Sequence, residues 1–225
     1  MRLRDDDEAG ITDSPLLMVS VLLAVVLLVV AMTADPIALG TDVGERAPAI
    51  EGVAYDGDGW VDFSLEDYFD TSWKEGEPGQ WIILEFMDTD CPYCVQSAAE
   101  VGDWDAYFDA SNSDWNNEDV QVIAVAAELN IQGHDSSREE IEAFRDKTSG
   151  YACASQQDCS ARSGAPHAFP YVDDLRLDAM DDWGIRGTPT YFVIQPDGIV
   201  AWNSDNTARY DNAGEAVASL AVVDA

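Results

Sequence analysis

Residues 81–94 read WIILEFMDTDCPYC and carry the clearest structural signal in the chain. Residues 81–87 are apolar except for Glu85, which predicts a central strand that is buried on both faces. The segment after the second cysteine predicts a helix, because apolar side chains recur there at helical spacing. These side chains are Val95, Ala98, Val101, Trp104 and Phe108. The pair Cys91 and Cys94 therefore falls at a turn between a strand and a helix.

This position gives the two thiols different chemistry. Cys91 lies close to the first N–H groups of the helix, which have no partner within the helix and favour a thiolate. Cys94 follows one turn later, close enough to form a disulfide with Cys91. Such a pair is a reversible two-electron switch and is typical of redox proteins with alternating strands and helices.

A zinc site is the main alternative for a C-x2-C pair. Structural zinc needs four ligands, usually with a second pair of Cys or His at similar spacing. The other two cysteines, Cys153 and Cys159, have the spacing C-x5-C. The only histidines, His134 and His167, are far apart in the sequence. We therefore expect no metal site.

Residues 15–34 form an apolar segment without a charged residue. About 20 residues that rise about 1.5 Å each span about 30 Å, the hydrocarbon thickness of a bilayer. We therefore expect a transmembrane anchor. The alternative is a cleaved signal peptide, whose apolar region is usually about 7–15 residues long and ends in an A-x-A-like site. The sequence Ala31-Met32-Thr33 matches such a site only weakly.

The basic residues around this segment predict its orientation. Arg2 and Arg4 precede it, and the next basic residue is Arg46. By the positive-inside rule, residues 1–14 lie in the cytoplasm and the rest of the chain lies outside. The expected location is the cell membrane, with a single span and with the main body in a compartment that permits disulfides.

The charge of the chain is strongly acidic. It contains 44 acidic and 11 basic residues, for a net charge of −33, and the acidic residues are spread along the whole chain. This charge argues against binding to nucleic acid and against docking on anionic lipid. The composition is similar to that of proteins from high-salt habitats.

We expect a linker over residues 35–47 and one α/β domain over residues 48–225, with an insert near residues 149–168. A turn at residues 56–59 predicts a hairpin in front of the domain. Further strands are expected at 81–87, 120–127, 169–172, 190–194 and 199–202, and helices at 95–108, 138–147, 174–183 and 212–223. This order predicts a mixed sheet flanked by helices, with an antiparallel hairpin at one edge.

The order of these features resembles the thioredoxin superfamily. After the strand, the C-x-x-C pair and the helix, residues 183–194 read WGIRGTPTYFVI and residues 196–198 read PDG. The expected anchor, front hairpin and insert are most similar to the membrane-anchored TlpA/ResA/DsbE-like thiol–disulfide oxidoreductases. The resemblance extends from about residue 48 to the C-terminus.

The resemblance implies roles for several residues. Pro189 should follow a cis peptide bond, with Thr188 beside the dithiol and open backbone for a substrate chain. Glu85 stands where thioredoxins carry a buried acid, which could move the proton of Cys94. The alternative is that Glu85 faces solvent and has no such role.

The sequence departs from the family pattern next to the first cysteine. Asp88, Thr89 and Asp90 stand where the family usually has a tryptophan. Two nearby carboxylates oppose a thiolate, so we expect the pKa of Cys91 to be less depressed than usual. Pro92-Tyr93 is the dipeptide of glutaredoxins, and we interpret it as tuning the dithiol and contacting substrate.

Cys153 and Cys159 are expected to form a structural disulfide that holds the insert. The alternative is a second redox pair that relays electrons to Cys91 and Cys94.

Together these features predict an enzyme that exchanges disulfides with protein substrates. The Cys91 thiolate attacks, and Cys94 resolves the mixed disulfide. No cofactor is expected beyond this dithiol, and a membrane electron donor or an oxidising partner must reset it. Two other functions remain open.

One is a copper-handling module like the SCO proteins, which use C-x3-C and a downstream histidine, whereas residues 187–190 contain none. The other is a peroxiredoxin-type peroxidase, whose Pro-x3-Thr-x2-Cys motif is absent before Cys91.

Overall fold

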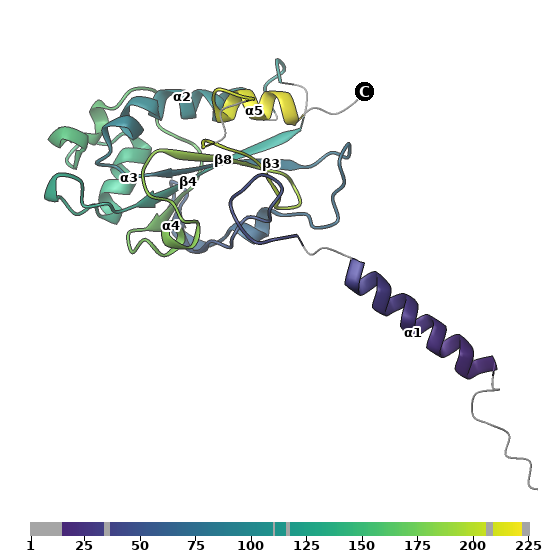
Figure 1. The fold of residues 1–225 in the computed structure, drawn as a ribbon. Helices are drawn as coiled ribbons and strands as arrows, with labels where there is room; N and C mark the ends of the chain where they lie inside the picture. The colour runs from purple at the N-terminus through teal and green to yellow at the C-terminus, as the bar shows by residue number, and fades with distance from the viewer. Residues whose placement is uncertain (1–14, 34–36, 110, 116–117, 206–208, 222–225) are drawn as a thin grey trace, which may run out of the picture. The chain divides into compact units, whose positions relative to one another are not determined.

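A computed structural model of the chain describes residues 15–33, 37–109, 111–115, 118–205 and 209–221 (Figure 1). It forms two compact units, residues 1–37 and residues 38–225. Each unit is considered by itself.

The first unit contains one helix, α1 (Pro15–Thr33). Its described side chains, those of residues 18–28, are exposed. No helix among the residues described here is both long and apolar enough to cross a membrane. Residues 1–14 and 34, which belong to the expected cytoplasmic end and anchor, lie outside the described part.

The second unit begins with the expected hairpin, β1 (Glu51–Tyr55) and β2 (Trp60–Ser64), which pair antiparallel. The Asp56 carboxylate accepts hydrogen bonds from the N–H groups of Asp58 and Gly59 at 2.9 and 3.0 Å. Gly57 has a φ of 106°, a conformation that glycine adopts without steric cost. These local features explain why the chain turns here.

The sheet has seven strands in the order β2-β1-β7-β4-β3-β8-β9. The further strands are β3 (Gln80–Met87), β4 (Asp119–Ala127), β7 (Tyr171–Asp174), β8 (Thr190–Ile194) and β9 (Val200–Asn203). β3 pairs parallel with β4 and antiparallel with β8, so the sheet is mixed, as predicted. The run of residues 81–87 is therefore an interior strand with a partner on each edge.

Helices cover both faces of this sheet. α2 (Pro92–Phe108) and α5 (Ala213–Leu220) lie on one side and the short α4 (Asp178–Asp182) on the other (Figure 1). Alternate residues of β3 enter different cores. Ile83 packs in the core that includes α2, α5 and α3 (Arg138–Asp146), and Leu84 packs in the core that includes α4.

The insert carries its own short elements: β5 (Ala152–Cys153), η4 (Ala154–Gln156), β6 (Gln157–Asp158) and η5 (Cys159–Ala161). β5 and β6 form a separate two-stranded sheet. The N–H of Ala154 donates to the carbonyl oxygen of Thr89 at 3.0 Å. The insert is therefore docked on the loop that precedes Cys91.

Three sequence expectations differ from the structure. Residues 38–47 are part of the domain rather than a linker, because Gly44 N–H bonds to the Val200 carbonyl at 2.8 Å and Ala47 is buried. The helix expected over residues 95–108 starts at Pro92 instead. The predicted helix over residues 174–183 is shorter and consists only of α4. Asp174 is the last residue of β7, and its carboxylate accepts hydrogen bonds from the N–H groups of Ala179 and Met180 in the first turn of the helix.

Candidate active site

The two thiols lie where β3 leads into α2. Cys91 is the N-cap residue of α2 and Cys94 lies in its first turn. Both cysteines are free, and they are only 3% and 1% exposed. The Cys91 thiol donates to the carbonyl oxygen of Thr188 at 3.3 Å. The strand-to-helix turn predicted from the sequence thus places the dithiol beside the segment that precedes β8.

The surroundings of Cys91 favour its thiolate. A hydrogen bond from the Cys94 thiol is the largest effect that lowers the pKa of Cys91, to about 5. The Thr188 side chain and the N–H groups of Cys94 and Tyr93 lower it further, and burial opposes them. The Thr188 hydroxyl has no other hydrogen-bond partner among the described residues, so it is free to donate to the thiolate.

Cys94 has the opposite character. Burial raises the pKa of its thiol well above the usual value, and the hydrogen bond to Cys91 and the negative charge of Glu85 act in the same direction. At neutral pH the pair therefore consists of one thiolate and one protonated thiol. This is the state that a nucleophile and a resolving cysteine require.

We expected Asp88 and Asp90 to hold up the pKa of Cys91, but neither is among the main effects on it, and both carboxylates have partners of their own. Asp88 accepts the N–H groups of Asp90 and Leu129 at 2.7 and 2.9 Å. Asp90 contacts Nδ1 of His134 at 2.5 Å. The hydrogen-bond donors of Cys94, Thr188 and Tyr93 therefore determine the pKa of Cys91.

Glu85 is buried in β3 and not in contact with bulk solvent, with 3% exposure. Burial raises its pKa to about 8, although a hydrogen bond from Tyr191 lowers it in part. The Tyr191 hydroxyl lies 3.0 Å from Glu85 Oε1 and 3.0 Å from Ser97 Oγ. Ser97 in turn lies 3.3 Å from the carbonyl oxygen of Cys94. A line of polar groups thus joins β3, β8 and α2.

Sequence reasoning missed Tyr191 and Ser97. Glu85 and Tyr191 are direct neighbours in the antiparallel register of β3 and β8. That register depends on how two distant segments pair, and neither segment reveals it alone. The alternation of residues along β8 would be the one usable signal, because it places every second side chain on the face of Glu85.

The residues expected to contact substrate surround the dithiol. The Thr188–Pro189 peptide bond is cis, as the resemblance implies. Pro92 is exposed, and Tyr93 is 69% exposed. Cys91 therefore has an accessible rim, although its own sulfur is largely buried.

The insert also contributes buried polar side chains, one of which affects Glu85. The Arg162 guanidinium donates to the carbonyl oxygens of Phe144 and Arg145 at 2.5 and 2.9 Å, and its charge lowers the pKa of Glu85 in part. His167 lies 2.6 Å from the Tyr171 hydroxyl, and burial lowers the pKa of His167 to about 3. Both side chains are buried, although the sequence suggested only a loop for this region.

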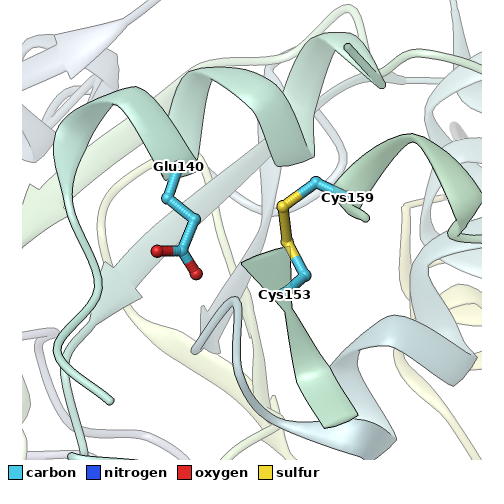
Figure 2. Close-up of side chains that lie close together, drawn as sticks. All are labelled: Glu140, Cys153 and Cys159. Atoms are coloured by element: carbon cyan, nitrogen blue, oxygen red, sulfur yellow. A yellow bond between two sulfur atoms is a disulfide. The ribbon is translucent and has the colours of Figure 1, made fainter. Parts of the chain in front are cut away.

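The predicted disulfide joins Cys153 and Cys159, which are both buried. One carboxylate oxygen of Glu140 lies within 4.8 Å of both sulfur atoms (Figure 2). Another group of potential ligands, also within 4.8 Å of one another, consists of Asp90, His134 and the same Glu140. The sequence did not suggest this convergence, because the five residues come from four separate segments.

The family comparison agrees with this site. The AhpC/TSA family model matches residues 43–203, which include β1 to β9 and the dithiol. The chain belongs to the AhpC/TSA family. No curated protein matches it. Family membership and the free dithiol together support a redox enzyme.

Solved structures share the thioredoxin-like fold of this AhpC/TSA chain. An uncharacterised conserved protein from Geobacillus kaustophilus is 14% identical, with 77% of this chain and 74% of that chain covered and a TM-score of 0.51. The mitochondrial 2-Cys peroxiredoxin of Plasmodium falciparum is 13% identical, with 80% and 92% covered and a TM-score of 0.50. A thiol:disulfide interchange protein from Bacteroides sp. is 16% identical, with 82% and 91% covered and a TM-score of 0.49.

Proposed function

We propose that this chain is a thiol–disulfide oxidoreductase that exchanges disulfides with protein substrates outside the cytoplasm, in the manner of TlpA/ResA/DsbE-like proteins. The observation that carries the proposal is the opposite perturbation of two adjacent thiols. The pKa of Cys91 is lowered to about 5, whereas that of Cys94 is raised.

In the reducing direction, the Cys91 thiolate attacks one sulfur of a substrate disulfide. A mixed disulfide forms, and the first substrate thiolate leaves. Cys94 then loses its proton and attacks the Cys91 sulfur, which releases the second substrate thiolate. Two electrons pass from the dithiol to the substrate, and Cys91 and Cys94 end as a disulfide. The oxidising direction uses the same atoms in reverse.

Glu85 is suited to accept the proton of Cys94. The negative charge of Cys91 contributes to the raised pKa of Glu85. When Cys91 enters the mixed disulfide, this charge disappears, and the pKa of Glu85 falls. Glu85 then ionises more readily at the step in which Cys94 needs a base.

The substrate chain would lie against the exposed rim. Tyr93 offers an aromatic surface next to Cys91, and the backbone around Thr188 and Pro189 lies within reach of the attacked sulfur. A partner must then restore the dithiol or the disulfide, and we assign this to a membrane electron donor or an oxidant.

The membrane tether is part of the proposal, and it is supported by the sequence of residues 15–34, which contains no charge. Membranes from cells that express the full chain can be washed with alkaline carbonate. We expect the chain to stay in the pellet, and release into the wash would contradict the tether.

The catalytic roles are tested with two single variants of the full chain. Cys91→Ser should abolish reduction of a protein disulfide such as that of insulin. Cys94→Ser should retain a reactive Cys91 and accumulate mixed disulfides. If Cys94→Ser traps no substrate while Cys91 still reacts with an alkylating agent, the assignment of attacking and resolving thiols is wrong.

The same preparation separates this function from the two alternatives. A peroxidase would oxidise Cys91 with hydrogen peroxide faster than with a protein disulfide. A copper module would bind cuprous ion through Cys91 and Cys94 with higher affinity than a simple dithiol. We expect neither result.

A further inference from the structure

The carboxylate of Glu140 lies between two groups of potential metal ligands. Figure 2 shows Glu140 extending from α3 beside the Cys153–Cys159 disulfide. One of its oxygens is within 4.8 Å of both sulfur atoms, and the carboxylate also belongs to the group with Asp90 and His134. The side chain of Glu140 is only 4% exposed. A buried carboxylate is unfavourable unless a cation or hydrogen-bond donors compensate it.

His134 is oriented as a metal-binding histidine would be. Its Nδ1 contacts Asp90 Oδ2 at 2.5 Å, and its Nε2 faces Glu140 Oε2 at 3.9 Å. In metal sites the non-ligating ring nitrogen usually donates to a carboxylate, which fixes the ring and its tautomer. The separation of 3.9 Å is too long for a hydrogen bond but close to the spacing of two ligands on one ion.

The carboxylate of Glu140 is held in the same way. The Thr89 hydroxyl donates to Glu140 Oε1 at 2.9 Å, which leaves Oε2 toward His134. Thr89 Oγ1 also lies 2.9 Å from Ser136 Oγ. Both potential ligands, the imidazole and the carboxylate, thus have a second partner that fixes their orientation.

A small cavity lies between His134 and Cys153. Its volume is about 30 Å³, and His134, Asp90 and Cys153 are among the residues that line it. This volume suits one water molecule or one ion. The His134 side chain is 46% exposed, so solvent reaches the cavity along its ring.

We propose that reduction of the Cys153–Cys159 disulfide creates a site for one zinc-like divalent cation. Cys153, Cys159 and Glu140, which already form one group, are three ligands, and His134, from the neighbouring group that shares Glu140, moves in as the fourth. Two thiolates, one imidazole and one carboxylate form a tetrahedral donor set that suits Zn²⁺. The C-x5-C spacing is no obstacle, because β5 and β6 pair and bring the two Cα atoms to 5.0 Å.

The exchange balances with a dithiol as the reductant. The dithiol gives two electrons and two protons to the Cys153–Cys159 disulfide and is itself converted to a disulfide. The cation then binds both sulfurs as thiolates, and two protons pass to solvent. In the reverse direction, a disulfide accepts two electrons from the two thiolates. The Cys153–Cys159 bond forms again, and the cation is released. The disulfide and the bound cation therefore exclude each other.

The site would communicate with the dithiol by a short route. Asp90 holds His134 and immediately precedes Cys91, and Ala154 of the insert bonds to the backbone of Thr89. Binding would therefore order the loop that leads into α2. This gives the insert a role beyond the structural disulfide expected from the sequence.

The test uses the full chain with Cys91→Ser and Cys94→Ser, so that the only thiols are those of the insert. A phosphine reduces the disulfide without adding a competing thiol. Titration with Co²⁺ should give one ion per reduced chain, with the absorption of a tetrahedral cobalt thiolate, and Zn²⁺ should displace it. The oxidised chain should show no such absorption.

Variants in the same background locate the ligands. Asp90→Asn, which changes only the partner of His134, should weaken binding by about 10–100-fold. Glu140→Gln and His134→Gln should weaken it more. Glu139→Gln changes the exposed preceding residue of α3 and should leave the affinity unchanged.

Three results would overturn the proposal. The first is equal binding by the oxidised and reduced chains. The second is reduced Glu140→Gln and His134→Gln variants that bind like their parent. The third is a reduced chain that binds no Co²⁺. Hydrogen exchange would show whether its insert is still folded, but either result contradicts the proposal. The Cys153→Ser/Cys159→Ser variant needs no reduction and must also show no thiolate absorption.

Discussion

Among single residues, Glu85 shows most clearly how burial gives an ordinary side chain an unusual property. An acid in the central strand would normally be unfavourable, but here the Tyr191 hydroxyl and the charge of Arg162 offset part of the cost. The remaining cost appears as a pKa of about 8, near the pH at which a proton carrier is most useful.

Tyr191→Phe should raise the pKa of Glu85 further, because the carboxylate loses a hydrogen-bond donor. The expected shift is about one pH unit, which corresponds to about 1.4 kcal/mol and is typical of a hydrogen bond to a charged group. The pH profile for resolution of the mixed disulfide should move upward by the same amount. Tyr107→Phe, a half-exposed tyrosine of α2, is the control. An unchanged profile would show that Tyr191 does not act through Glu85.

Glu85 should also make stability depend on pH. The folded chain holds this proton up to a pKa of about 8, whereas an exposed carboxyl releases it near 4.5. Between these values the unfolded chain binds fewer protons, so the free energy of unfolding falls as the pH rises through this window. Urea denaturation at several pH values should show a flatter dependence for Glu85→Gln than for the parent chain. Parallel curves for the two proteins would contradict the raised pKa.

Among the elements, the insert differs most from the rest of the sheet. Its strands β5 and β6 pair only with each other, and its disulfide closes a loop within the insert. Contacts with α3 and the bond to the loop before Cys91 hold it to the domain. Arg162, which follows η5, carries a buried charge that lowers the pKa of Glu85 in part. An element outside the main sheet thus contributes to the electrostatics of the dithiol.

Loss of the insert disulfide should destabilise the domain. The bond closes a short loop, with a sequence separation of 6. The chain-entropy relation gives about 2 kcal/mol for such a loop. Urea denaturation of Cys153→Ser/Cys159→Ser in the presence of a chelator should show this decrease. A loss close to zero would indicate that the contacts with α3 hold the insert by themselves.

For the molecule as a whole, the dominant property is its charge of −33. Few basic groups compensate it, and two arginines, Arg145 and Arg162, are buried and bonded to backbone carbonyls. The remaining surface therefore repels itself at low ionic strength.

Salt should stabilise the folded chain. The screening length falls from about 10 Å at 0.1 M to about 3 Å at 1 M, which reduces the repulsion among exposed carboxylates. The melting temperature should rise with sodium chloride, and sulfate at equal ionic strength should act equally at first. A melting temperature that responds only to sulfate would indicate a salting-out effect on apolar surface instead.

The sequence by itself determined most of the elements and the position of the dithiol between a strand and a helix. Residues 81–87 are apolar except for Glu85, and Cys91 and Cys94 follow at the start of a helix. These properties depend on neighbours within a few positions, so periodicity and turn residues suffice to read them. The order of strands and helices followed in the same way.

Only the tertiary structure decided which distant groups meet. The pairing of β3 with β8 brings Tyr191 to Glu85, and the docking of the insert brings Glu140 to Cys153 and Cys159. It also brings Thr188 to Cys91, where hydrogen bonds from Cys94 first and then from Thr188 lower the pKa of Cys91 to about 5. Hydrogen bonds and charges act through space over a few ångströms, whereas sequence patterns report only neighbours along the chain.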